Sequence, residues 1–415
     1  AMCSAKGSAG PDGWAADEIR HLPFQARQVT LTKPGKIQAD GTLQVKHTRP
    51  ISVCSIFWRI YASAWASNQQ LQQWASQHFH PSVVYGKGSE SAEACAARLQ
   101  DAFTKQGGYM ATLDWTSAFD RMQPEITARA LVELGLPAAI PKLLLEAWGS
   151  QQRFISFEGH THEHVLMAGK ATPQGCPLAP FILSLWVSAG TRAVEQDVQD
   201  SSAELSCYMD DRTFYSRRWE KVTDRISAWQ GWSRTMGMQE APDKVQICAR
   251  GKDYVTILGL HGRPAWVQPD IKVLGACTMS GPRKYTDTEG KRLAAAFTRS
   301  ALLAGASLSW ERLLLAHRAF VLSVAAYGWV GRFPTQTASE KLFNSLTVGF
   351  RSGKVASRDL RQLFYGATAH LGMAVLARTW NRLCKALSNG REREWHNRPF
   401  STLGILRRHL KDQKW

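Results

Sequence analysis

Apolar positions follow two different periods along the chain, and the change of period separates two regions. Runs rich in β-branched residues flank a Pro-Gly and Asp-Gly loop between 26 and 53, which predicts a β-hairpin. Helical spacing runs from Ile56 to His80 and then, after a Gly/Ser break at 85–91, on to Phe103. From about Pro282 onward the pattern is almost entirely helical. The chain is therefore predicted to be mixed α/β first and helical in its last third.

The middle of the chain predicts strands and helices that alternate. The predicted elements are a buried strand at 109–115, helices starting near 124 and 137–141, a hairpin at 151–170, a helix at 181–198, two strands flanking 208–211, a helix at 219–236, and strands near 244–249 and 254–260. This β-α-β-β-α-β order is typical of a split βαβ arrangement, so we predict an α+β fold.

The composition restricts the class of partner. The 415 residues carry a formal net charge of +17, and 44% of them are hydrophobic, so the chain is predicted to be globular and to bind a polyanion, most simply nucleic acid. None of the eight cysteines forms a C-x-x-C pair, so no zinc knuckle is predicted, and an intracellular protein fits. Because no run of about 18 apolar residues occurs, we expect no membrane partner.

Three carboxylates stand at predicted strand ends. Asp210 and Asp211 are adjacent in "YMDD", between two β-prone runs, and Asp114 ends the predicted strand "YMATL". Like charges at one rim of a sheet repel unless a cation lies between them. Oxygen ligands without Cys or His suit Mg²⁺, and two such ions, or Mn²⁺ in their place, would support phosphoryl transfer. On its own the Asp pair fits a solvated turn as well, so the prediction depends on the accompanying motifs.

Those motifs occur in a family order. Along the chain they are "GPDG" (10–13), "LTKPGK" (31–36), "TRPISV" (48–53), "VVYGKGSESAEA" (83–94), "LDWTSAFD" (113–120), "TPQGCPLAP" (172–180), "YMDD" (208–211), "GMQEAPDKVQI" (237–247), "ILGLHG" (257–262) and "AAYGW" (325–329). The series resembles reverse transcriptases, and most of all those of non-LTR (LINE-type) retrotransposons. The resemblance covers nearly the whole chain.

The resemblance implies a right-hand polymerase fold with fingers at 1–108, a split-βαβ palm at 109–265 with part of the fingers interleaved, and a helical thumb with a C-terminal extension at 266–415. It implies an RNA-directed DNA polymerase that extends a DNA primer on an RNA template with dNTPs. The protein is expected in the nucleus if the retroelement is eukaryotic. No endonuclease motif is visible, so the chain is expected to be part of a longer protein, and its oligomeric state is left open.

The same resemblance assigns the catalytic residues. Asp114 and Asp210 match the ligands of both metal ions, and Asp211 matches a third, more peripheral carboxylate. Lys244 matches a lysine that gives a proton to the pyrophosphate leaving group.

It also assigns substrate-binding residues. Phe119 matches the steric gate that excludes a ribose 2′-hydroxyl, and Gln174 and Gly175 match the loop that lines the nucleotide pocket. Arg49 and Lys33 match fingers residues that grip the incoming triphosphate, with Lys36 as a rival to Lys33.

Some positions depart from the LINE pattern, and two other functions share parts of it. Tyr-Met replaces Phe-Ala before the two Asp, Ala179 replaces Ser, and the segment before Lys244 lacks the usual Asn. One alternative is an RNA-dependent RNA polymerase, which has the same carboxylate plan; Phe119 and the fingers motifs argue against it. The other is a decayed retroelement fragment that only binds nucleic acid, which the intact carboxylates argue against.

Overall fold

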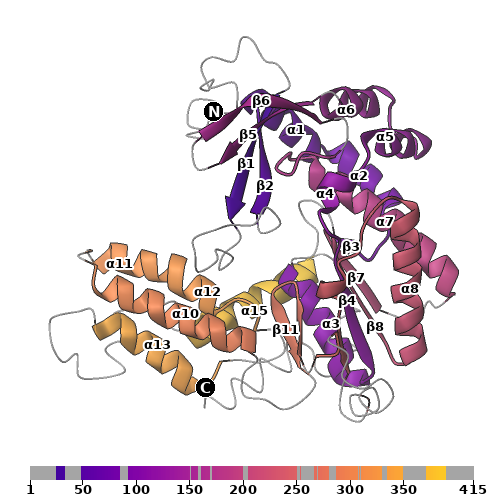
Figure 1. The fold of residues 1–415 in the computed structure, drawn as a ribbon. Coiled ribbons are helices and arrows are strands. Elements are labelled where there is room, and N and C mark those ends of the chain that lie inside the picture. Colours follow the sequence, from indigo (N-terminus) through magenta and orange to yellow (C-terminus); the bar gives the residue numbers. More distant parts are fainter. Residues whose placement is uncertain are drawn as a thin grey trace.

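The computed structural model describes three groups of elements (Figure 1). The described residues are 25–32, 48–84, 92–149, 151–157, 160–168, 171–199, 204–249, 253, 266–268, 270–279, 287–306, 308, 310–329, 334–348 and 371–388. A four-stranded sheet with its helices lies at the top of Figure 1, a five-stranded sheet at the right, and a group of helices at the lower left. The predicted strand at 254–260 lies outside the described residues.

The four-stranded sheet joins two hairpins that are far apart in sequence. Its order is β2-β1-β5-β6, formed by β1 (Gln25–Thr32), β2 (Thr48–Cys54), β5 (Gln151–Phe157) and β6 (His160–Ala168). Strand β1 is antiparallel to β2 and parallel to β5, and β5 is antiparallel to β6. Both predicted hairpins are confirmed. Their pairing means that the chain enters this sheet, leaves it and returns.

Helices adjoin this sheet. They are α1 (Ile56–Ala66), α2 (Gln69–His78), α5 (Pro124–Glu133) and α6 (Ala139–Gly149). The helical pattern from Ile56 to His80 breaks into two helices because Asn68 caps the second one, its side-chain oxygen accepting a hydrogen bond from the Leu71 amide at 3.1 Å. Pro124 starts α5 as predicted.

The five-stranded sheet is the core of the molecule. Its order is β3-β7-β8-β4-β9, formed by β3 (Val83–Val84), β7 (Glu204–Tyr208), β8 (Asp211–Ser216), β4 (Tyr109–Leu113) and β9 (Gln246–Ala249). Helices α3 (Ala92–Gln106), α7 (Ala179–Val198) and α8 (Trp219–Thr235) pack on it.

The side chains of β4 show why this central strand is apolar throughout. Tyr109, Ala111 and Leu113 belong to the cluster that includes α7 and α8, whereas Met110 belongs to the cluster that includes Leu99 of α3. Successive side chains of a strand point to opposite faces, so both faces of β4 are buried.

The remaining elements follow a short hairpin. Strands β10 (Asp270–Val273) and β11 (Ala276–Met279) pair across Leu274 and Gly275, whose φ angles of +50° and +82° suit a two-residue hairpin turn. The sequence pattern did not predict this hairpin. Then come α10 (Asp287–Ala304), α11 (Trp310–Ala316), the π-helical turn η3 (His317–Leu322), α12 (Ser323–Ala325), α13 (Gln336–Val348) and α15 (Leu371–Ser388). In the described residues after Pro282, the predicted helical content is confirmed.

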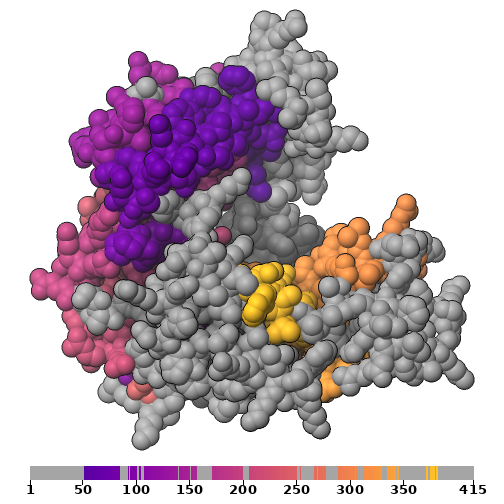
Figure 2. Space-filling model, turned by 180° about the vertical axis from the view of Figure 1, so that it is seen from behind, coloured from indigo at the N-terminus to yellow at the C-terminus, as the bar shows by residue number. Residues whose placement is uncertain are grey.

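The helical group has its own core and stands apart from the first sheet. Leu293, Val321, Leu342 and Val375 share a cluster that contains no residue of the five-stranded sheet. The space-filling view shows the indigo residues near 50–84 and the orange α10–α13 helices on different sides of the molecule (Figure 2). Among the described helices, none is both long enough and apolar enough to cross a bilayer.

Candidate active site

The "YMDD" segment forms the turn between β7 and β8. Tyr208 pairs with Asp211 across the antiparallel strands, so Met209 and Asp210 alone make the loop. The backbone of Met209 has φ +56°, in the left-handed region that a two-residue hairpin loop needs and that normally favours glycine. A methionine there carries strain, and such strain is concentrated at functional sites.

Strand pairing brings Asp114 to this turn. Leu113, the last residue of β4, pairs with Arg212, which follows Asp211. Burial, together with the charges of Asp114 and Asp211, raises the pKa of Asp210 to about 7. Burial and then Asp114 also raise the pKa of Asp211. The structure therefore places the three predicted carboxylates close enough to repel one another.

Lys244 is a cation that pairs directly with one of these carboxylates. It ends the short helix η2 (Pro242–Lys244), and its Nζ forms an ion pair with Asp114 Oδ2. The preceding Ala241 amide donates to the Asp114 carbonyl at 2.9 Å, which ties this segment to the end of β4. Partial burial lowers the pKa of Lys244, but the hydrogen bond and charge of Asp114 outweigh it, so the pKa is raised overall.

The carboxylates can be tested for their fit to a metal ion. Asp114 Oδ1 is buried and makes no hydrogen bond, and the pKa of Asp210 is high because its neighbours are negative. A divalent cation bound between these carboxylates would relieve both features. Within the described ranges, no group of three or more His, Cys, Asp or Glu side chains stands ready to hold a metal. Mg²⁺ is commonly held by one or two carboxylates with substrate phosphates and water, so the residues fit such a shared site.

The predicted gate residue lies against the predicted nucleotide loop. Phe119 is half-buried on the short helix α4 (Ala118–Arg121), and its carbonyl accepts a hydrogen bond from the Thr172 amide at 2.8 Å. The Ala171 amide donates to the Met122 carbonyl at 3.2 Å. These contacts fasten the start of the "TPQG" loop to the segment that follows Asp114.

The other end of this loop lies on the first sheet. The Gln174 carbonyl accepts from the Ser52 amide of β2 at 2.6 Å. Gly175 has φ +125°, and a Cβ there would overlap the Ser52 carbonyl oxygen, so only glycine fits. Arg49 lies on the same strand β2, paired with Leu31, but its side chain is outside the described part. Lys33 and Lys36 lie outside the described residues.

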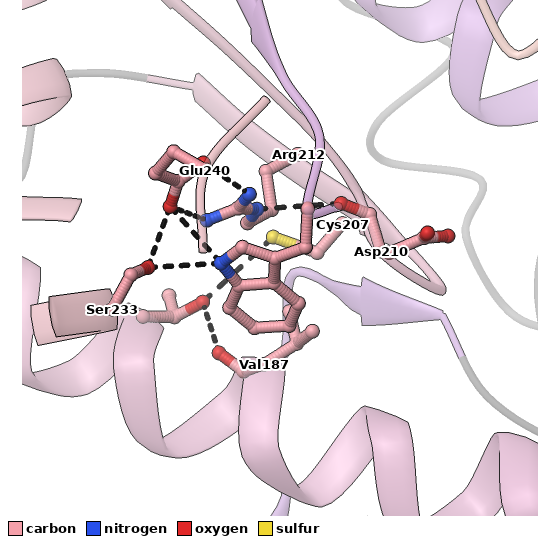
Figure 3. A network of polar contacts seen from close by, with 8 residues as sticks. Val187, Cys207, Asp210, Arg212, Ser233 and Glu240 are labelled. Carbon is pink, nitrogen blue, oxygen red and sulfur yellow. Dashed lines mark hydrogen bonds and ion pairs between the residues drawn. The ribbon is translucent and has the colours of Figure 1, made fainter. Parts of the chain in front are cut away.

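Sequence reasoning missed a charged network beneath the turn (Figure 3). Arg212 is completely buried and makes two hydrogen bonds of 2.7 Å to the two carboxylate oxygens of Glu240. Ser233 and Trp115 also donate to Glu240, at 2.5 and 3.0 Å. The only signal in the sequence was the position of these residues. Arg212 and Trp115 directly follow predicted catalytic aspartates, and Glu240 lies in "GMQEAPDKVQI", the motif that lacks the usual Asn before the lysine.

Comparison with known proteins settles the family. The family model "Reverse transcriptase (RNA-dependent DNA polymerase)" matches residues 32–276, which is more than half of the chain. The chain belongs to the reverse transcriptase family. The reverse transcriptase domain has the right-hand polymerase fold, and the mixed α+β elements with their five-stranded sheet agree with it.

Solved structures of telomerase are also similar to this reverse transcriptase. Apo telomerase from Candida tropicalis, truncated from its C-terminal domain, is 13% identical over 62% of this chain and 53% of that chain, with a TM-score of 0.44. Telomerase from Candida albicans with a TWJ fragment of telomeric RNA is 11% identical over 78% of this chain and 58% of that chain, with a TM-score of 0.41. The matched region thus spans a little over half the length of these telomerase chains.

Proposed function

We propose that this chain copies RNA into DNA, extending a DNA primer 3′ end with dNTPs, as the polymerase of a non-LTR retroelement. The observation that carries the proposal is the meeting of Asp114, at the end of β4, with Asp210 and Asp211 in the β7–β8 turn, inside a reverse transcriptase domain. The order of the LINE-type motifs along the chain supports the retroelement assignment.

Each residue has a role in the proposed reaction. Asp114 and Asp210 would hold two Mg²⁺ ions, with Asp211 beside them. Such ions lower the pKa of the attacking hydroxyl and neutralise charge on the phosphates. Lys244, which already faces Asp114, would give a proton to the departing pyrophosphate. A lysine ammonium is protonated at neutral pH, as a proton donor must be.

The remaining residues select the nucleotide. Phe119 would lie under the sugar and leave no room for a 2′-hydroxyl. The loop at Gln174 and Gly175 would form the pocket wall, because its backbone bridges the palm segment at Phe119 and the fingers strand β2. Arg49 on β2, together with Lys33, would bind the triphosphate, since an Arg fork suits phosphate oxygens.

Primer extension tests the proposed function. The assay uses a DNA primer on an RNA template with Mg²⁺, and it compares dNTPs with rNTPs. We expect extension with dNTPs by the parent and no extension by Asp114→Asn. Asp224→Asn, which changes an exposed carboxylate of α8, should extend like the parent.

Two results would replace this assignment. Preferential extension with rNTPs would indicate an RNA-dependent RNA polymerase. Binding of primer-template without extension, in either Mg²⁺ or Mn²⁺, would indicate a retroelement fragment that only binds nucleic acid.

A further inference from the structure

A buried ion pair lies under the aspartate turn. Arg212 has no exposed side-chain surface, and the side chain of Glu240 is 9% exposed. Each terminal nitrogen of Arg212 donates to a different oxygen of Glu240 at 2.7 Å. The guanidinium carbon lies 4.1 Å from the ring centre of Trp115 and 4.6 Å from that of Trp229. A forked pair whose guanidinium also packs over two indole rings that meet edge to face is restricted to one orientation.

The pair is bonded to both strand ends that carry the aspartates. Arg212 directly follows Asp211, and its Nε donates to the Asp210 carbonyl at 3.3 Å (Figure 3). Trp115 directly follows Asp114, and its indole nitrogen donates to Glu240 Oε1 at 3.0 Å. Glu240 is therefore the common acceptor for one residue next to each group of aspartates.

Glu240 also fixes the segment that leads to Lys244. It forms a β-bridge with Trp115, and its neighbour Gln239 accepts from the Thr116 amide at 2.8 Å. On its other side, the Ala241 amide donates to the Asp114 carbonyl at 2.9 Å. The side-chain network and these backbone bonds thus hold the two aspartate segments and the 239–244 segment as one unit.

The physics of buried pairs suggests what this one contributes. Replacing a buried ion pair by apolar residues of similar volume is often neutral or stabilising, so stability alone does not explain Arg212 and Glu240. An apolar pair would fill the same space, but it would not fix the relative orientation of the two segments that carry the aspartates. Groups that bind a metal must be held within about 0.5 Å of their working geometry.

We propose that Arg212 and Glu240, with Trp115, are positioning residues that set the separation between Asp114 and the Asp210-Asp211 turn for binding of a divalent cation. This inference rests on the proposed function, because it needs the aspartates to be metal ligands. It assigns a role to Glu240, which lies in the fourth motif, where this sequence differs from the family pattern. It also assigns a role to Arg212, which follows "YMDD".

Two variants separate positioning from stability. Arg212→Met combined with Glu240→Leu replaces the ion pair by an apolar pair. Glu240→Gln keeps the shape of Glu240 but removes its charge and one acceptor. Arg217→Met, which changes an exposed arginine just after β8, is the matched control.

Each protein is titrated with Mn²⁺ in the absence of nucleotide and primer, and free Mn²⁺ is measured by electron paramagnetic resonance. We expect the Kd for Mn²⁺ to rise about 10- to 100-fold in both test variants, as for other residues that orient metal ligands. The Kd of the two test variants for primer-template should stay within about twofold of the parent value. The control Arg217→Met should match the parent in its Kd for Mn²⁺ and in its Kd for primer-template, because it changes only an exposed side chain.

Other results would overturn the inference. If the apolar pair melts like the parent and binds Mn²⁺ with the parent's Kd, the network does not position the aspartates. If the apolar pair shows no cooperative melting, the network is a requirement for folding and the positioning role fails. If the parent itself binds no Mn²⁺, the aspartates do not hold a cation without substrate phosphates and the inference fails, whereas the proposed function is decided separately by primer extension.

Discussion

Removing the charge of Asp210 should stabilise the metal-free protein while it abolishes activity. Asp210 is partly buried beside Asp114 and Asp211, and its pKa rises from an ordinary 3.8 to about 7. One pKa unit is worth about 1.4 kcal/mol, so holding this carboxylate ionised in the folded protein costs at most about 4 kcal/mol. Asp210→Asn removes that charge with almost no change in shape.

The size of the effect depends on pH in a known direction. Because the folded-state pKa is raised, the folded protein binds more protons than the unfolded chain between about pH 4 and 7, and stability falls as pH rises through that window. The advantage of Asp210→Asn is therefore greatest at pH 8. At pH 5 Asp210 is protonated in the folded protein, and the advantage should shrink to less than half.

Thermal melting in EDTA measures this effect. A palm-sized domain shifts by roughly 2–4 °C per kcal/mol, so a cost of at most about 4 kcal/mol limits the rise in the melting temperature of Asp210→Asn at pH 8 to about 8–16 °C. Added Mg²⁺ should raise the melting temperature of the parent and not that of the variant. Asp224→Asn should change stability by no more than about 0.5 kcal/mol. A variant that melts at or below the parent at pH 8 would refute the argument that the carboxylates repel one another.

Three further changes test other contacts. Phe119→Ala should lower the preference for dNTPs over rNTPs by at least about tenfold, measured as the ratio of kcat/KM values, because the ring is the proposed barrier to the 2′-hydroxyl. Gly175→Ala should destabilise by about 1–3 kcal/mol in thermal melts, because φ is +125° and the new Cβ meets the Ser52 carbonyl. Gly190→Ala should destabilise by about 1–3 kcal/mol, because its Cβ would stand 2.5 Å from the Trp229 ring.

These predictions have their own controls. Gly231, on α8, has open space around an added Cβ, so Gly231→Ala should stabilise by about 0.4–1 kcal/mol. An equal loss of stability in Gly190→Ala and Gly231→Ala would contradict the packing argument. An unchanged nucleotide preference in Phe119→Ala would remove the gate assignment, and parental melting of Gly175→Ala would mean that the loop does not lie against β2.

Much of the fold could be predicted because its signals are local. The apolar run of β4, the proline that starts α5 and the long apolar helix α7 each reflect a pattern within one segment. The short hairpin of β10 and β11 was missed because its turn, Leu274-Gly275, has a leucine in a left-handed conformation that sequence does not announce.

The residues of the candidate site could likewise be predicted only where their signals are local. Asp114 and Asp210 could be found because they occur in ordered motifs, and strand pairing then brings the motifs together. The pairing of Arg212 with Glu240 could not be found, since 28 positions separate them and nothing local marks either as a partner. The packing of the Gly175 loop on β2 likewise depends on a contact between segments more than a hundred residues apart.

We propose that this reverse transcriptase domain copies RNA through the aspartates at the end of β4 and in the β7–β8 turn. The most direct test measures primer-template binding and DNA extension together, on one RNA template with Mg²⁺ and dNTPs, for the parent and Asp210→Asn. We expect equal binding by both proteins, extension by the parent, and a complete loss of extension in the variant. Extension by Asp210→Asn at the parent's rate would contradict this proposal.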